Sequence, residues 1–285
     1  MFDLSILVVI YGRSISDSST LQSLKSNKLL KSTVSLTIWN NGPVALDTKN
    51  ELDEFIESGF ETSYVETISN LSLAEIYNKF ILENSSASYV ILDHDSFITN
   101  DLFNSYLRFP SNKVGLPKID AMGEIKAPFI NGQIISKDYK FKNNDLVTSI
   151  GSGVIIGSSV ICDMKKRFIK VFDERFYLYG VDTTFFKRIY SMDSMDNSVF
   201  MLLPELKHSL SRLEKEDKLV TSFRIIERSY DFGLVLRYYT PVYLVPIRLS
   251  YQLLKHVKKL ILKEKIIYNF KHVLRALVTG RHYRS

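Results

Sequence analysis

The sequence has few of the residues that characterise disulfide-rich, fibrous or membrane-spanning proteins. Its 285 residues include one cysteine, Cys162, which excludes an internal disulfide or a multi-cysteine metal site, and we expect it to be buried. The 12 glycines and 7 prolines are too few for a fibrous or disordered chain. No apolar run reaches the roughly 18 residues of a membrane span, and the acidic Asp3 does not fit a signal peptide. We therefore expect a globular protein of a reducing compartment.

Several common catalytic motifs are also missing from the sequence. It contains no GxxxxGK[ST] phosphate loop, no GxGxxG, no HExxH and no GxSxG. These absences argue against a P-loop NTPase, a kinase, a dehydrogenase, a zinc protease and a serine hydrolase.

The net charge of +6 is distributed unevenly along the chain. Residues 235–285 hold 11 lysines and arginines and one acid, whereas the remaining 234 residues have a net charge of −4. A basic tail favours an anionic partner, which is a lipid surface, a nucleic acid or an acidic protein.

The first 100 residues alternate between apolar, β-branched runs and helical patterns. This alternation predicts a doubly wound α/β sheet with right-handed crossovers. The predicted strands are 4–10, 34–39, 62–66 and 88–93, and the predicted helices are 21–30, 47–58 and 71–83.

The second half of the chain is less regular. We expect irregular structure with scattered short β-like pieces over 110–150. A strand at the end of SIGSGVIIG (149–157), a helix near 159–169 and a strand over 199–204 should follow. Beyond residue 205 the pattern is mostly helical, with a break at Pro241 and Pro246. The predicted domains are residues 1–210 and a basic helical extension, 211–285.

Polar residues follow three of the predicted strands. They are Tyr11, the pair Asn40 and Asn41, and Asp93-His94-Asp95. In doubly wound sheets, ligands bind outside the carboxyl ends of the strands, so we expect these side chains to converge on one edge.

Asp93 and Asp95 are the first candidates for chemistry. Two acids at this spacing after a buried strand can bind one hard cation, Mg²⁺ or Mn²⁺, which would neutralise a nucleotide diphosphate. The alternative is an Asx turn at a strand end.

Asp182 and His208 are the next candidates, and each has two interpretations. Asp182 either caps a helix that begins near it or acts as a general base. His208 is either a surface histidine or a further ligand of the same metal.

Several segments within residues 3–210 resemble the inverting GT-A glycosyltransferases of family 2, in particular bacterial rhamnosyltransferase-like members. The segments are LSILVVIYG, WNNG at 39–42, NLSLAEIYN at 70–78, VILDHDS at 90–96, SIGSGVIIG, FDERFYLYGVDTTFFKR at 172–188 and LKHSL. Asn40, Ser72 and Gly180 depart from the family pattern. The resemblance implies a GT-A fold, which is a Rossmann-like, mainly parallel sheet flanked by helices.

The resemblance also assigns roles to particular residues. Asp182 is the implied catalytic base, and Asp95 with His208 is implied to hold Mg²⁺ or Mn²⁺. The implied donor-binding residues are Tyr11, Asn40, Asn41, Asn70, Asn78, Asp93 and Asp95. The implied acceptor side comprises Ser152, Gly153 and Arg188.

The function implied by the resemblance is metal-dependent transfer of a sugar with inversion, and dTDP-rhamnose is the expected donor. The acceptor would be a polysaccharide or lipid-linked glycan of the bacterial surface, such as O-antigen or capsule. One alternative is another sugar, such as galactofuranose or a hexose from a UDP donor. The other is an inactive GT-A-like scaffold.

The tail interleaves apolar and basic residues at helical spacing. Leu253, Leu254, Val257, Leu260 and Ile261 can share one face, with lysines around them. This composition predicts helices that lie on an anionic membrane. The resemblance implies that this membrane is the bacterial inner membrane, with the protein at its cytoplasmic face. The alternative is a helical hairpin packed on the enzyme or on a second subunit of a homo-oligomer. We expect no nucleic-acid partner, because no recognised module frames the basic residues.

Overall fold

The computed structural model describes residues 1–27, 33–48, 50–192, 197–209 and 218–285. It divides into two compact units. Unit 1 comprises residues 1–71, 76–171 and 188–211, and unit 2 comprises 72–75, 172–187 and 212–285. The predicted domain boundary at residue 210 lies outside the described residues.

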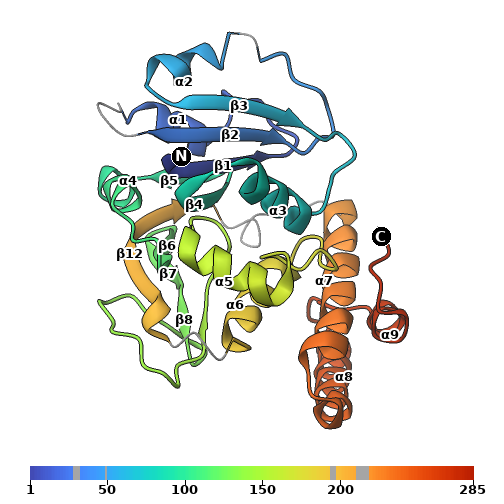
Figure 1. Ribbon diagram of the computed structural model, residues 1–285. Helices are drawn as coiled ribbons and strands as arrows, with labels where there is room; N and C mark the ends of the chain where they lie inside the picture. Colours follow the sequence, from blue (N-terminus) through green and yellow to red (C-terminus); the bar gives the residue numbers. More distant parts are fainter. Residues whose placement is uncertain (28–32, 49, 193–196, 210–217) are drawn as a thin grey trace. The chain divides into compact units, whose positions relative to one another are not determined.

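Unit 1 is built on a mixed sheet in the order β3-β2-β1-β4-β11-β6-β12-β5, with β7 paired to β6 (Figure 1). Strands β1 to β4 are parallel to one another, and β6 is parallel to β12, whereas β11 is antiparallel to both β4 and β6. The strands of this sheet are β1 (Phe2–Ile10), β2 (Val34–Asn40), β3 (Glu61–Glu66), β4 (Ser86–Asp93), β5 (Ser96–Ile98), β6 (Val114–Ala121), β7 (Glu124–Ala127), β11 (Ile155–Gly157) and β12 (Phe200–His208). A small second sheet pairs β10 (Val147–Thr148), β8 (Phe129–Ile130) and β9 (Gln133–Ile134).

Helices cover both faces of the large sheet, and the alternation of side chains along the strands explains why. Leu4, Ile6, Val8 and Ile10 of β1 belong to one apolar cluster with residues of α1, α2 and α4. On the other face, Tyr89 of β4 meets the ring of Phe80 in α3, with ring centroids 5.9 Å apart. The helices that lie wholly or partly in this unit are α1 (Ser19–Lys25), α2 (Asp53–Glu57), α3 (Leu73–Glu83), α4 (Asn100–Leu107), α5 (Ser158–Phe168) and α6 (Gly180–Tyr190), and η1 is Asn197–Val199.

The prediction of an α/β sheet flanked by helices is confirmed, and the first four strands lie close to their predicted ranges. Two local predictions were wrong. The predicted helix over 47–58 contains only the short α2, Asp53–Glu57. Residues 110–150 were expected to hold only scattered short β-like pieces, but they contain β6, an eight-residue strand between β11 and β12.

Pro117 disguised β6 in the sequence, because a proline cannot donate a ladder hydrogen bond. The structure accommodates it at an irregularity: the register of β12 against β6 shifts between Leu203 and Glu205, directly beside the Pro117–Leu203 pair. Bulges of this kind interrupt the ladder locally and let the strand continue. Strand β12 therefore extends to His208, four residues beyond its predicted end.

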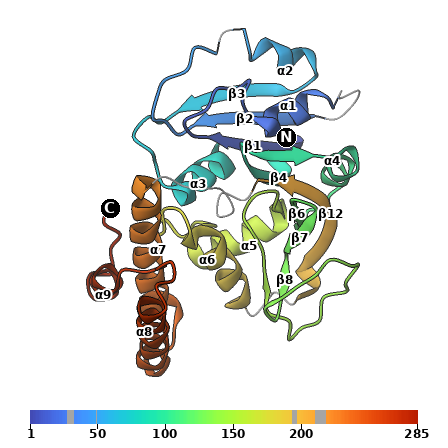
Figure 2. The ribbon, with the colours of Figure 1, turned by 180° about the vertical axis from the view of Figure 1, so that it is seen from behind.

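Unit 2 contains the C-terminal helices α7 (Lys218–Tyr239), α8 (Val245–Ile261) and α9 (Phe270–Thr279), with η3 (Val242–Leu244) between the first two. Helices α7 and α9 lie side by side (Figure 2). A Cβ on Gly233 would lie 2.4 Å from the carbonyl oxygen of Val273, so this close approach requires glycine. Arg237 of α7 donates hydrogen bonds to the carbonyls of Leu277 and Val278. Pro241 follows the end of α7, as predicted.

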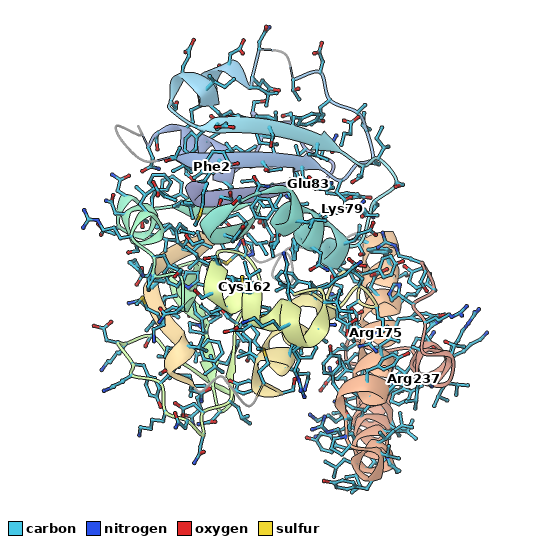
Figure 3. The ribbon with its side chains drawn as sticks, in the orientation of Figure 1. Phe2, Lys79, Glu83, Cys162, Arg175 and Arg237 are labelled. Atoms are coloured by element: carbon cyan, nitrogen blue, oxygen red, sulfur yellow. The ribbon has the colours of Figure 1, made fainter. Side chains whose placement is uncertain are left out.

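Figure 3 marks Cys162 on α5, where it is exposed. Our expectation of a buried cysteine was therefore wrong. The buried residues of α5 are Val160, Ile161 and Met164, and the sequence position of Cys162 places it on a different side of the helix.

The core packing of unit 1 gives a stability prediction. Leu36 of β2 is fully buried in the main apolar cluster, whereas Leu82 of α3 is 77% exposed. We expect Leu36→Ala to lower the free energy of unfolding by about 2–5 kcal/mol. The matched Leu82→Ala should change it by less than about 0.5 kcal/mol. Chemical denaturation of both variants measures the difference, and similar values for the two would contradict the described core.

Candidate active site

The candidate site lies at the carboxyl ends of the parallel strands of unit 1. The register places Asn40 of β2 opposite Ile10 of β1, and Asp93 of β4 opposite Val9. Tyr11 follows β1 directly and is 47% exposed. The predicted convergence of these residues on one edge of the sheet is therefore confirmed.

Asp93, Asp95 and His208 form a cluster at this edge. One ligand atom of each lies within 4.8 Å of the other two. The His208 Nδ1 atom is 3.3 Å from Asp95 Oδ1, and its Nε2 atom is 3.9 Å from Asp93 Oδ2. The imidazole side chain is only 6% exposed, whereas the carboxylates are 39% and 26% exposed. His208 is thus a buried member of the cluster, so its interpretation as a surface histidine was wrong.

Strand pairing brings His208 to the two acids. In the antiparallel ladder of β12 with β5, His208 is paired with Ser96, the residue after Asp95. The Ser96 hydroxyl shares a hydrogen bond of 2.9 Å with His208 Nδ1 and another of 3.0 Å with the Ser152 hydroxyl. Ser152 in turn accepts a hydrogen bond from the Asp93 amide. A buried chain of hydroxyls therefore links the histidine to the backbone of the aspartate motif.

Hydroxyl groups at the start of α1 also form hydrogen bonds that fix the loop with the two acids. The Thr20 hydroxyl donates to the Asp93 carbonyl and accepts from the Ser96 amide, and the Ser18 hydroxyl donates to the His94 carbonyl. Sequence reasoning missed Ser18, Thr20 and Ser96. Nothing local to their sequence signals this role, because each acts on residues at least 56 positions away.

The geometry and chemistry of the cluster fit a divalent cation. One ligand atom of each residue lies within 4.8 Å of the other two, which is close to the spacing of about 3–4 Å between ligands of one octahedral ion at about 2.1 Å. Two carboxylates and one imidazole suit Mn²⁺, and Mg²⁺ prefers oxygen ligands. Burial raises the pKa of Asp95, the His208 ring lowers it, and the neighbouring Asp93 raises it again. A cation bound between the acids would stabilise the charged form of Asp95.

Asn40 and Asn41 form hydrogen bonds within the protein. The Asn40 amide nitrogen donates to the Val44 carbonyl and to Glu66, and its oxygen accepts from the Gly42 amide. Gly42 has a φ of 97°, and a Cβ there would lie 2.5 Å from the Ile68 carbonyl oxygen, so the turn requires glycine. Asn40 is 1% exposed and therefore shapes the loop after β2. Its contact with a nucleotide stays a prediction.

Asn41 connects this loop to the segment before α3. Its amide nitrogen donates to Asn70 Oδ1 and to the Leu71 carbonyl, while its oxygen accepts from the Leu71 amide and the Thr67 hydroxyl. Asn78 is half-buried on α3. The structure thus brings Asn41 and Asn70 together, and the donor-binding roles of these three asparagines stay predictions.

The three residues predicted for the acceptor side have structural contacts of their own. Ser152 is 2% exposed and belongs to the hydroxyl chain described above. Gly153 has a φ of 83°, and a Cβ there would lie 2.5 Å from Leu206 Cδ2. Arg188 is 8% exposed and donates to the carbonyls of Lys170 and Val171. Their contact with an acceptor stays a prediction.

Asp182 belongs to unit 2, where it lies in the first turn of α6. It is half-buried, and its Oδ1 atom accepts a hydrogen bond of 2.7 Å from the Thr183 amide. A carboxylate in this position is favoured by the helix dipole. Both interpretations of Asp182 fit this placement, and its role as a base stays a prediction.

Neither a family model nor a curated protein matches the sequence. The structure, however, is similar to solved structures. Against TarS of S. aureus the TM-score is 0.53 at 14% identity, over 87% of this chain and 39% of that one. Against TarS residues 1–349 in complex with UDP-GlcNAc it is 0.54 at 14% identity, over 97% and 71% of the two chains. Against GalNAc-T7 with UDP, GalNAc and Mn²⁺ it is 0.53 at 11% identity, over 82% and 51%.

These similarities define the fold. The mixed α/β sheet flanked by helices is the GT-A fold of the glycosyltransferases, as the sequence resemblance implied. The chain spans about two fifths of the TarS chain and about half of the GalNAc-T7 chain.

The cluster gives a prediction for metal binding. We expect Asp95→Asn and His208→Ala each to weaken Mn²⁺ binding at least about tenfold, because each removes one ligand from the set. His94→Ala is the matched control, because His94 lies between the two acids but outside the cluster. Isothermal titration with Mn²⁺ measures the effect. Unchanged affinity in both cluster variants would contradict a metal site at these residues.

Proposed function

We propose that this chain is an inverting, metal-dependent glycosyltransferase that uses a nucleotide-sugar donor. The observation that carries the proposal is the cluster of Asp93, Asp95 and His208 at the carboxyl edge of a GT-A sheet. This edge is where nucleotides bind in doubly wound sheets. A cluster of this chemistry can hold the cation that a diphosphate leaving group needs.

The proposed reaction is a single displacement. Asp182 accepts the proton of an acceptor hydroxyl, and the oxygen attacks the anomeric carbon from the face opposite the nucleotide. The bond from this carbon to the diphosphate breaks in the same step, so the configuration inverts. A divalent ion held by Asp93, Asp95 and His208 would neutralise the charge of the departing nucleoside diphosphate.

Two donor classes are supported by different observations. The sequence resemblance supports dTDP-rhamnose. The fold neighbours solved with UDP, UDP-GlcNAc or GalNAc support a UDP-linked hexose as the second candidate. In either case we propose a glycan or lipid-linked acceptor of the bacterial surface, such as O-antigen or capsule.

Asp182→Asn tests the base. We expect it to lower the transfer rate by about 10²–10⁴, because the amide cannot accept the acceptor proton, while donor binding stays nearly intact. Glu174→Gln, in the same segment, is the control. Transfer is assayed with dTDP-rhamnose, UDP-galactofuranose, UDP-GlcNAc and UDP-GalNAc, with and without Mn²⁺, and donor binding by thermal shift.

Three outcomes would contradict the proposal. Full activity of Asp182→Asn would exclude Asp182 as the catalytic base. Equal loss of donor binding and rate would assign it to the donor site. Absence of metal-dependent nucleotide binding by the wild type would favour the inactive scaffold.

We further propose that the chain acts at the cytoplasmic face of the bacterial inner membrane and binds it through α8. None of the 17 residues of α8 is buried. Its apolar side chains are therefore open to solvent, with Ile247, Leu254 and Ile261 between 63% and 74% exposed. Positions 247, 254 and 261 are seven residues apart and so lie along one face of the helix.

Charge supports an anionic surface as the partner. Lys255, Lys258 and Lys259 interleave with the apolar residues of α8, and the helix carries no acid. Each basic residue near an anionic bilayer contributes about 1 kcal/mol to binding. Among the described residues, no helix combines the length and apolar character of a membrane span.

Substitution on α8 tests the membrane proposal. We expect the double variant Leu254→Glu/Ile261→Glu to lose at least about tenfold in affinity for phosphatidylglycerol vesicles. It removes two apolar side chains, and burial of each in the bilayer contributes about 1.5–3 kcal/mol to binding. Leu82→Glu, on an equally exposed leucine of α3, is the control. Co-sedimentation with vesicles measures binding. Unchanged binding, or a dimer in solution that the double variant dissociates, would contradict the proposal.

A further inference from the structure

A buried carboxylate of α7 contacts the segment that carries Asp182. Asp231 is 4% exposed. Its Oδ2 atom accepts hydrogen bonds from the amides of Tyr179 and Gly180, at 2.9 and 3.0 Å. Its Oδ1 atom has no hydrogen-bond partner among the described residues. One oxygen of Asp231 therefore binds two consecutive amides at the start of α6.

These amides are at the point where α6 begins, three and two residues before Asp182. The first amides of a helix have no partner within the helix, and a carboxylate both satisfies them and matches the helix dipole. The Thr184 hydroxyl donates to the Gly180 carbonyl, which fixes the same turn from the helix side.

Close packing around this turn leaves it little room to move. A Cβ on Gly180 would lie 2.3 Å from the ring of Phe176, so the backbone passes directly against that ring. The guanidinium of Arg228, one turn before Asp231 on α7, stacks on the ring of Tyr179 at 4.6 Å. Contacts with α7 and with Phe176 thus hold the first residues of α6 in place.

Burying the carboxyl group of Asp231 is energetically unfavourable, and an apolar residue would avoid this penalty. Burial raises its pKa well above the ordinary range, and the carboxylates of Glu227 and Asp182 raise it further, against the two amide hydrogen bonds. Replacing a buried ionisable group by a well-packed apolar one is often neutral or stabilising. The hydrogen bonds to the first turn of α6 are what an apolar residue at this position would lose.

We propose that Asp231 is a positioning residue for Asp182: it fixes the first turn of α6 and thereby the direction of the Asp182 carboxylate. This inference rests on the proposed function, because it assumes that Asp182 is the base. It adds a residue from α7, outside every motif that the sequence analysis singled out.

The test compares two substitutions at one position. Asp231→Ala removes the acceptor, and we expect kcat to fall by about 100-fold, as for a base displaced by about 1 Å, with little change in KM for the donor. Asp231→Asn keeps an oxygen that can accept from both amides, and we expect it to restore kcat to within about threefold of the wild type. Rescue by asparagine separates positioning from the loss of a charge.

Glu227→Ala is the matched control. Glu227 lies one turn earlier on α7 and is equally buried, but its Oε1 atom accepts from Tyr283 and contacts Arg284 rather than the start of α6. We expect a lower melting temperature for this variant with kcat unchanged. Thermal unfolding of all variants confirms that each is folded under the assay conditions.

Three results would overturn the inference: normal kcat in Asp231→Ala, failure of asparagine to restore kcat, or an equal loss of kcat in Glu227→Ala. Failure of the proposed function is a separate outcome, because it appears in Asp182→Asn. An inactive Asp182→Asn with a fully active Asp231→Ala refutes the positioning role alone.

Discussion

The pairing of β5 with β12 is the constraint on which the candidate site depends. It places His208 opposite Ser96, a residue 112 positions earlier, and thus beside Asp95 and Asp93, the last residue of β4. The hydrogen bonds from Ser96 to His208 and to Ser152 then fix the histidine ring while it is almost fully buried. The acids stay partly open to solvent. One buried imidazole beside two accessible carboxylates is an arrangement that can accept a cation without rebuilding the sheet edge.

Many polar residues around this site form hydrogen bonds that order the backbone. Asn40 and Asn41 use their amides to order the loops after β2 and before α3, and Arg188 binds two backbone carbonyls. In unit 2, Asp231 binds the start of α6 in a similar way. Rigid support of this kind is what a catalytic constellation needs, because small displacements of a reacting group cost large factors in rate.

The sequence predicted what depends on local patterns. Continuous apolar runs identified β1, β2 and β4, and the aspartate motif followed from its position after β4. Predictions from the sequence were wrong where a local rule is broken. Pro117 argued against the strand β6, and the irregularity between β6 and β12 was not foreseen, so the extension of β12 to His208 was missed. It also missed Thr20, Ser96 and Asp231, because their roles arise only from contacts between distant segments. The resemblance identified the GT-A fold, which periodicity alone left as a generic α/β sheet.

The central claim is that Asp93, Asp95 and His208 hold one divalent cation. Anomalous diffraction from crystals grown with Mn²⁺ and a nucleoside diphosphate tests it most directly. The account predicts a single Mn²⁺ peak at about 2.1 Å from carboxylate oxygens of the aspartate motif and from one ring nitrogen of His208. A Mn²⁺ peak elsewhere, or nucleotide bound at the sheet edge without an ion at these three residues, would contradict the account.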